Sequence, residues 1–357
     1  MDATIKDIAA RAGVSISTVH YALSGTRPIR EATRERVLAA VRELDYQPHS
    51  SAATLPSGRT GRLAVVIAGL EPAFANTYFS DYVRGLAAAA EARDYTVVLY
   101  TAYRRRADEG WRPAHVLRRR EADGIVLLGT QVPREHLDEL AARDAPCVLL
   151  NREHPGLPSI SADRRQGAAQ GTAHLLALGH HPVALFAGDF PGGGPAGERP
   201  ELAGFLEAHR AVGREVAPAL VRFAPAPGRA APVAGELLGE LGRSGADGRR
   251  PGLLLFSYTL AGEVCRAIAG AGLEVPDDLA LVVGDEDSGL QEPLDVPLTT
   301  VQAPKFEMGE AAVALLLERI QKGPGGGAVT RLEVPMRLKV RRSCGARSTG
   351  PERVGRV

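Results

Sequence analysis

Short apolar runs separated by helical stretches follow residue 60, and they constrain the fold of this chain more than any other feature. Seven runs of four or five mostly apolar residues lie at 63–67, 96–100, 124–128, 147–150, 183–186, 252–256 and 279–283. Ala- and Leu-rich stretches typical of helices lie between them, such as 82–93, 167–178 and 261–270. Apolar strands that alternate with helices predict parallel sheets covered on both faces. We therefore expect two doubly wound units that face one another across a cleft at the carboxyl ends of their strands.

The length and the cysteine content indicate a multidomain protein of a reducing compartment. A chain of 357 residues predicts two or three domains. Cys147, Cys265 and Cys344 are scattered and lack the spacing of metal ligands, which argues against a structural zinc site. No apolar run approaches the roughly 18 residues that span a membrane, and no export signal opens the chain. We expect a cytoplasmic protein without a membrane partner, metal or cofactor.

Residues 4–23 have the pattern of two short helices joined by a tight turn. Thr4 with Asp7 resembles a capping box at the start of the first helix, and Gly13 is expected to end that helix in the left-handed conformation. Ser15 is a good N-cap for the second helix. This arrangement is typical of a helix-turn-helix, whose second helix enters the major groove of DNA. The same turn also occurs in ordinary two-helix corners of helical bundles.

A third helix favours the DNA-binding interpretation. Apolar residues at helical spacing would complete a three-helix core, namely Val37, Leu38, Val41 and Leu44. Charge gives little support, because residues 1–60 carry eight Lys and Arg against six Asp and Glu. The DNA-binding prediction therefore rests on the geometry of the motif.

Three motifs in this region occur in a fixed order: Ile5-Lys-Asp-Ile-Ala-x-x-Ala-Gly-Val-Ser-x-Ser-Thr-Val19, Thr33-Arg-Glu-Arg-Val37 and Asp45-Tyr-Gln-Pro48. Together they resemble the head piece of the lactose-repressor family of bacterial transcription regulators. The resemblance implies a helix-turn-helix domain over residues 1–48, followed by a hinge helix and linker over 49–60. In that family a hinge leucine enters the minor groove and kinks the duplex, and Leu55 occupies the matching position. The DNA-binding residues expected from the motif and the resemblance are Thr4, Ser15, Ile16, Ser17, Thr18, His20, Tyr21 and Leu55.

Two departures from the family pattern concern DNA recognition. His20-Tyr21 stands where the family commonly has Ser-Arg in the recognition helix. The two rings of His20 and Tyr21 can stack, donate one hydrogen bond or touch a thymine methyl. They replace a guanidinium group, which is suited to guanine. Pro56 directly follows Leu55 and disfavours helical geometry there, so the hinge helix is expected to end at about Leu55. We expect a base preference different from the common pattern.

The resemblance continues through the body of the chain at lower specificity. It is carried by Arg84-Gly85, Asp123-Gly124, Ser161-Ala-Asp163, His174-Leu175, Gly179-His180, Val283-Gly284 and Pro297-Leu-Thr-Thr300. It implies an α/β periplasmic-binding-protein-like domain of two doubly wound subdomains over 61–345. One subdomain would comprise about 61–160 and 291–323, and the other about 161–290 and 328–345, with crossings near 160, 290 and 325. Residues 346–357 have the composition of a disordered tail without Leu heptads, so a homodimer is expected.

Loops that follow the strands supply the candidate effector contacts. Aromatic rings stack on a ring or sugar face, and carboxylates accept hydrogen bonds from hydroxyls. The candidates are Tyr78, Phe79, Gln131, Asn151, Arg199, Ser257 and Glu286. Simpler roles stay open, since Asn151 could close a turn, Asp163 could cap a helix, and residues 285–287 could form a solvated loop.

The effector site also departs from the family pattern. Glu201 stands where sugar-responsive members typically carry an arginine, and Arg199 is the nearest substitute. Ser257-Tyr258 replaces their usual Asn-Asp. We therefore expect an effector other than a common monosaccharide bound in the usual way. The segment from Pro191 to Pro200 resembles an insertion.

Sheets of this kind also occur in enzymes and in solute-binding proteins. A cytosolic enzyme is disfavoured because GxSxG, P-loop, strand-linked GxGxxG and metal-ligand motifs are all missing from the sequence. A solute-binding protein for transport would need export and would not carry a helix-turn-helix. The sequence thus predicts a homodimeric transcriptional regulator, by resemblance a repressor, of a double-stranded DNA operator. A small-molecule effector, a sugar or related metabolite, would control it, and whether that effector releases or secures the DNA stays open.

Overall fold

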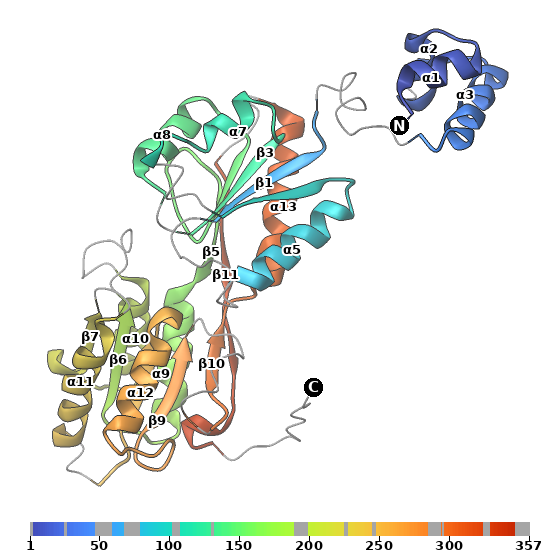
Figure 1. The fold of residues 1–357 in the computed structure, drawn as a ribbon. Coiled ribbons are helices and arrows are strands. Elements are labelled where there is room, and N and C mark those ends of the chain that lie inside the picture. Colours follow the sequence, from blue (N-terminus) through green and yellow to red (C-terminus); the bar gives the residue numbers. More distant parts are fainter. Residues whose placement is uncertain are drawn as a thin grey trace.

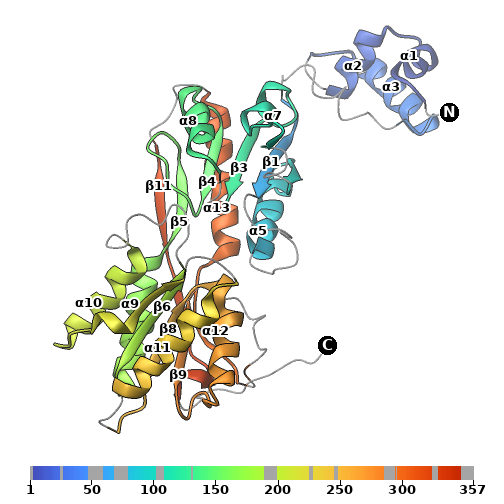
Figure 2. The ribbon, with the colours of Figure 1, turned by 60° about the vertical axis from the view of Figure 1, so that its left-hand side comes forward.

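The computed structural model contains a three-helix head piece followed by two α/β units (Figure 1). It describes residues 3–24, 27–46, 59–67, 79–101, 108–129, 132–188, 199–224, 228–244, 248–284, 294, 296–323 and 329–346. The predicted hinge helix with Leu55, and the tail from residue 347, lie outside the described residues. In Figures 1 and 2 the head piece stands apart from the two units.

The head piece consists of α1 (Ile5–Ala12), α2 (Ile16–Ser24) and α3 (Glu31–Glu43). Its small core is formed by Ile8, Ala9, Ala12, Val19, Ala22, Val37, Ala40 and Tyr46. Val41 and Leu44 pack against this core, whereas Leu38 is half-buried. The predicted three-helix arrangement is confirmed.

The first α/β unit contains a six-stranded sheet in the order β11-β5-β4-β3-β1-β2, and all its strand pairs are parallel. Its strands are β1 (Arg62–Ile67), β2 (Thr96–Tyr100), β3 (Gly124–Leu128), β4 (Cys147–Leu150), β5 (Ser159–Asp163) and β11 (Arg331–Pro335). Its helices are α5 (Ser80–Glu91), α7 (Ala114–Arg118), α8 (Arg134–Ala142) and α13 (Lys305–Lys322).

The second unit repeats this plan, with a sheet in the order β12-β10-β9-β8-β6-β7. Its strands are β6 (Val183–Gly188), β7 (Val221–Ala224), β8 (Gly252–Phe256), β9 (Ala280–Gly284), β10 (Thr299–Gln302) and β12 (Arg337–Lys339), which is antiparallel. Its helices are α9 (Arg164–Ala177), α10 (Pro200–Ala211), α11 (Ala230–Ser244) and α12 (Tyr258–Gly270), with the short turns η2 (Pro218–Leu220) and η3 (Arg342–Cys344).

Alternation along the strands explains why both faces of each sheet are covered. In β1, Val65 packs into the core under α5 and α13, whereas Ala64 and Val66 pack into the core under α7 and α8. In β8, Leu254 faces α9 and α10, while Leu255 faces α11 and α12. Successive side chains of a strand point to opposite faces, so a wholly apolar strand needs helices on both. The predicted doubly wound fold is confirmed.

The chain crosses between the two units three times, at positions that correct two of the predicted crossings. It crosses at 163–164 between β5 and α9, at 303–304 between β10 and α13, and at Met336 between β11 and β12. The predictions of about 290 and 325 were wrong. Residues 299–302 belong to the second sheet because β10 pairs with β9, and residues 331–335 belong to the first because β11 pairs with β5.

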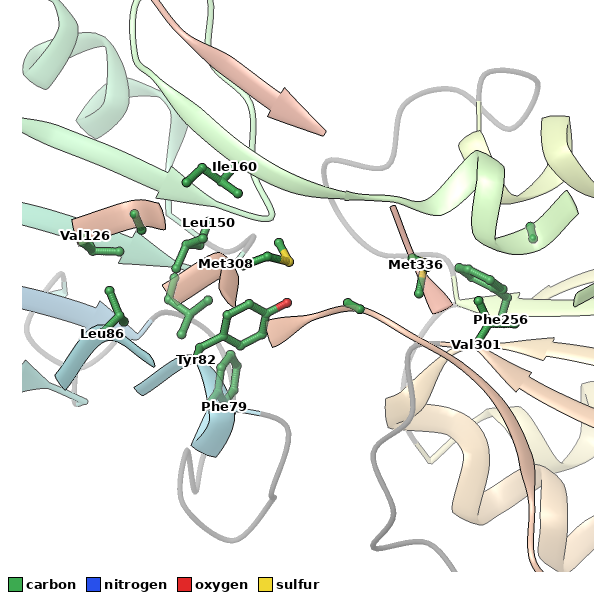
Figure 3. Packing of buried hydrophobic residues seen from close by; sticks show 14 of the residues in the cluster. Phe79, Tyr82, Leu86, Val126, Leu150, Ile160, Phe256, Val301, Met308 and Met336 are labelled. Atoms are coloured by element: carbon green, nitrogen blue, oxygen red, sulfur yellow. The ribbon is translucent and has the colours of Figure 1, made fainter. Parts of the chain in front are cut away.

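Hydrogen bonds and buried side chains hold the crossings together. The Asp163 carboxylate accepts from the Gln166 amide at 2.9 Å, and the Gln166 side chain accepts from the Met336 amide at 3.0 Å. Figure 3 shows Phe79 and Tyr82 side by side at the start of α5, and Met336 beside Phe256 and Val301 in the second unit. All five belong to one hydrophobic cluster that runs through both units.

Glycines allow helices of each unit to approach closely. A Cβ built on Gly204 of α10 would lie 2.0 Å from the carbonyl oxygen of Arg165 in α9. One on Gly85 of α5 would lie 2.0 Å from the carbonyl oxygen of Phe306 in α13. The backbone of a helix end cannot shift as a flexible side chain can. Glycine at these two positions therefore sets the packing distance of both helix pairs.

Gly204→Ala should destabilise the protein, and Gly235→Ala provides a matched control. Gly235 lies in α11, where an added Cβ would meet nothing within 4 Å. We expect Gly204→Ala to lower the free energy of unfolding by about 1–3 kcal/mol through overpacking. Gly235→Ala should raise it by up to about 1 kcal/mol through helix propensity. Urea unfolding measures both, and equal stabilisation by the two variants would contradict the close approach.

Candidate DNA-binding and effector sites

The start of α1 is fixed by hydrogen bonds between Thr4 and Asp7. The Asp7 carboxylate accepts from the Thr4 amide at 2.8 Å and from its hydroxyl at 2.6 Å. These bonds hold the pKa of Asp7 below its ordinary value. Gly13 ends the helix in the left-handed region with φ of 64°, and its amide donates to the carbonyl oxygens of the last turn. The side chain of Thr4 is thus engaged in starting the helix.

The start of α2 depends on Ser15. Its hydroxyl oxygen accepts from the Thr18 amide at 3.1 Å and lies 2.8 Å from the Thr18 hydroxyl. Val19 and Ala22 of the same helix are buried in the core of the head piece. Together the cap and the buried face fix which way the rest of α2 points.

The outer face of α2 exposes side chains suited to contacts with bases. Ile16 is 46% exposed and Ser17 is exposed, an unusual position for an isoleucine in so small a domain. The rings of His20 and Tyr21 lie nearly parallel, with centroids 6.5 Å apart. The guanidinium of Arg27 lies 5.5 Å from the centre of the Tyr21 ring. The sequence interpretation missed Arg27, which follows α2 in a loop and has no motif to mark it.

Four of the predicted site residues in the body and hinge lie outside the described residues: Leu55, Tyr78, Gln131 and Glu286. The same holds for residues 285–287 and for 191–198 of the segment interpreted as an insertion. The structure describes Phe79, Asn151, Arg199 and Ser257, and places each after a strand or at the start of a helix.

In the first unit, Asn151 contacts both α5 and β5 near the carboxyl ends of the strands. It follows β4 with φ of 55°. Its amide donates to the Tyr82 hydroxyl at 2.7 Å, and its side-chain oxygen lies 3.4 Å from the Ala162 amide. Phe79 is only 3% exposed and belongs to the hydrophobic cluster with Tyr82. Tyr82, which the sequence does not mark, is itself fully buried in that cluster, as an aromatic residue on a helix usually is.

In the second unit, charged side chains gather near the start of α9 and α10. Arg199 is buried, donates to the Gly188 carbonyl oxygen at 3.0 Å and stacks over Phe223. Glu201 is 6% exposed and lies 3.5 Å from the Nε of Arg164. The Arg164 guanidinium also lies 4.9 Å from the centre of the Phe256 ring. Arg164 is the first residue after a crossing, a position that sequence patterns did not reveal.

The carboxyl edges of both sheets meet at the crossings. The side chains described above for the first and the second unit therefore lie toward the same region of the protein. Asp163 at the end of β5 is in register with Pro335 of β11, and Gln302 at the end of β10 is in register with Arg337 of β12. Only Met336 separates β11 from β12. The two units therefore share the edge where ligands bind in open α/β sheets. Asp163 itself caps α9, as the simpler alternative had it.

Sequence comparisons match the whole organisation of the chain. Residues 4–49 match the model of bacterial regulatory proteins of the lacI family. Residues 60–225 match the periplasmic binding proteins and sugar binding domain of the LacI family, and 172–344 match a periplasmic binding protein-like domain. The HTH-type transcriptional regulator DegA of Bacillus subtilis is 30% identical and covers 87% of this chain, which spans 89% of DegA.

The chain belongs to the LacI family. The ribose operon repressor of Halalkalibacterium halodurans is also 30% identical, over 95% of this chain and 96% of that protein. The transcriptional repressor CytR of Escherichia coli is 28% identical, over 92% and 93%. These LacI-family relatives are regulators of transcription, so the chain is a DNA-binding regulator and not an enzyme. Within the described residues, no helix is long and apolar enough to span a bilayer.

Solved LacI-family structures share the fold. The lac repressor dimer bound to operator and the anti-inducer ONPF aligns with a TM-score of 0.76 and 24% identity, over 97% of this chain and all of that one. A complex of the transcriptional regulator CelR with cellobiose aligns with a TM-score of 0.65 and 25% identity, over 96% and 99%.

Ser15→Ala should destabilise the head piece, with Ser17→Ala as its control. Loss of the N-cap hydrogen bond is expected to cost about 1 kcal/mol. Ser17 is an exposed helical residue without a described hydrogen bond, so its replacement should leave stability unchanged or slightly raised. The midpoint of thermal unfolding of the head piece is measured in the full chain from the helical circular dichroism signal, and it is compared between the two variants. An equal midpoint for Ser15→Ala and wild type would contradict the cap.

Proposed function

We propose that this protein is a homodimeric transcriptional repressor that binds a roughly palindromic operator and whose DNA affinity is controlled by a small-molecule effector. The exposed outer face of α2 on a closed three-helix core is the observation that carries the proposal. Ile16 and Ser17 are exposed and lie beside the half-buried His20 and Tyr21, so α2 presents apolar, hydroxyl and ring groups outside the core. Such a surface fits a recognition helix in the major groove.

Base recognition is assigned to His20 and Tyr21, with Ile16 and Ser17 beside them. A histidine ring donates one hydrogen bond and stacks, and an isoleucine touches a thymine methyl. Arg27, which stacks on Tyr21, adds a guanidinium next to this face. Thr4, Ser15 and Thr18 lie at helix N-termini, where hydroxyls and amides suit contacts to phosphates. Leu55 is assigned the role of the minor-groove wedge.

Dimerisation follows from the geometry of such sites. Two head pieces read half-sites about one helical turn apart, so a two-fold protein matches a palindromic site. The lac repressor dimer bound to its operator, which shares the fold, supports this arrangement. A regulator that binds chromosomal DNA also acts in the cytoplasm of a bacterium.

The effector is assigned to the shared carboxyl edge of the two sheets. Asn151 on the first unit and Arg164 with Glu201 on the second offer an amide, a cation and a carboxylate there. Arg199 and Ser257, the N-cap residues of α10 and α12 on the second unit, belong to the proposed set together with Phe79, Tyr78, Gln131 and Glu286. A donor-rich sugar or related metabolite suits these groups, with Glu201 in place of the arginine typical of sugar-responsive members.

Binding at this edge would act on DNA through the angle between the units. A ligand that contacts both sheets favours one angle between the two units. Because the three crossings join the units, a change in that angle would move the first unit, to which the head piece is linked. By linkage, the effector changes operator affinity by the same factor as the operator changes effector affinity, which corresponds to a few kcal/mol at most.

Substitutions at His20 and Tyr21 should change which DNA is bound. His20→Ala and Tyr21→Ala are expected to alter the consensus obtained by selection from random duplexes, because they remove contacts to bases. Binding to a duplex of unrelated sequence should change little. A uniform loss of affinity across all duplexes would assign these residues to phosphate contacts and contradict the proposed reading.

Leu55→Ala should weaken operator binding at least tenfold, because an alanine cannot unstack a base step. Leu178→Ala, at an exposed leucine in the second unit, is the control and should bind as wild type. Fluorescence anisotropy with a selected duplex measures both. Equal affinity for Leu55→Ala and wild type would defeat the wedge assignment.

A further inference from the structure

Arginines are concentrated in residues 104–120. This stretch carries seven arginines against two acidic residues, whereas the whole chain has 43 Lys and Arg against 42 Asp and Glu. Arg104, Arg105 and Arg106 lie outside the described residues, but the other four are described. The recognition motifs of the head piece do not account for this local positive charge.

One histidine and two of the described arginines line one hollow of the surface. The apolar parts of His115 and Arg118 of α7, with those of Arg119 directly after it, line a shallow, open hollow of about 240 Å³. We call these three residues the α7 basic face. Arg118 forms no ion pair with a described residue, and Arg119 reaches Glu121 at 3.9 Å, with 68% of the arginine side chain exposed. Such an exposed contact neutralises little charge.

The charged groups around His115 are mainly arginines. Partial burial, followed by the charges of Arg118 and Arg119, lowers the pKa of His115 below its ordinary value. Arg112 acts in the same direction, and Glu139 opposes them. An anion paired with Arg118 or Arg119 would favour the protonated imidazole, so the pKa of His115 reports on anion binding.

The α7 basic face lies at the edge of the first sheet from which the chain leads to the head piece. Asp123 lies between α7 and β3, and its carboxylate accepts hydrogen bonds from the Thr60 and Gly61 amides at 2.6 and 2.9 Å. Its own amide donates to the Arg62 carbonyl oxygen at 2.8 Å. Figures 1 and 2 show α7 at the end of the first unit nearest the head piece.

The number of linker residues limits how far the head piece can lie from this edge. Residues 47–58 separate the described part of the head piece from Arg59, and twelve residues span at most about 40 Å even when fully extended. The opposite edge of the sheet, with the crossings and the proposed effector contacts, faces away. A polyanion held by the head piece is therefore brought to the same side as the α7 basic face.

We propose that the α7 basic face binds backbone phosphates of DNA that flanks the site held by the head piece. This inference rests on the proposed DNA binding. Exposed guanidinium groups pair with phosphates and release condensed counterions, which adds affinity without sequence preference. The body of the protein would thus extend the contact beyond the recognition helices.

Arg118→Gln/Arg119→Gln tests the proposal, with Arg210→Gln/Arg266→Gln as a control of equal charge. Both control residues are exposed, lie in the second unit and form no described ion pair. The probe is a 40-base-pair duplex of mixed sequence, titrated at several salt concentrations. We expect several-fold weaker binding at low salt and a salt slope smaller by about 0.9 for each lost phosphate contact. The control should retain the wild-type slope.

Thermal unfolding verifies that both variants are folded, and a titration of wild-type protein gives an independent readout. The duplex should raise the pKa of His115, observed by NMR of labelled histidine and assigned with His115→Gln. An unchanged salt slope in the double variant, or an unchanged His115 pKa in the saturated complex, overturns the inference. A pKa raised by inorganic phosphate but not by the duplex overturns it as well. If wild-type protein binds no duplex, the DNA-binding function itself fails.

Discussion

The three crossings between the two α/β units are the constraint on which the rest of the structure depends. At the first crossing, the Asp163 carboxylate accepts a hydrogen bond from the Gln166 amide. The Gln166 side chain in turn accepts one from the amide of Met336, which forms the third crossing. Because strands β5, β10 and β11 all end at these crossings, the carboxyl edges of both sheets are brought to one place. A ligand at that edge would touch both units, and the backbone that joins them is short and hydrogen-bonded.

The crossings also exchange helices between the units. Helix α13 follows a strand of the second sheet and packs on the first, and α9 follows a strand of the first and packs on the second. Glycine contacts then hold α13 against α5 and α10 against α9. One hydrophobic cluster consequently extends through both units. A change in their relative angle has to move whole helices, which favours a few discrete arrangements over gradual deformation. The opposite edge of the first sheet carries the linker to the DNA-binding head piece.

Much of this fold is predictable from local sequence. All seven apolar runs are strands, and all but the edge strand β2 are almost fully buried. The strands that were missed are polar or short, such as Thr299–Gln302 and Arg337–Lys339. The second crossing was misplaced because the polar strand β10 has no apolar run to mark it, and the third because β11 pairs with β5, which lies far away in the sequence. The caps at Thr4 and Ser15 and the turn at Gly13 were predictable from single residues. Arg27 over Tyr21 and Arg164 between Glu201 and Phe256 depend on tertiary packing, which no spacing reveals.

Coupling between DNA binding and the arrangement of the two units is the central claim. It can be measured by placing spin labels at Ala92→Cys on the first unit and Val212→Cys on the second, both exposed, since the native cysteines are buried. Excess unlabelled protein keeps one labelled chain in each dimer. Electron–electron distance measurements should show a distribution that shifts when a selected operator duplex is added. An identical distribution with the operator fully bound would contradict the coupling.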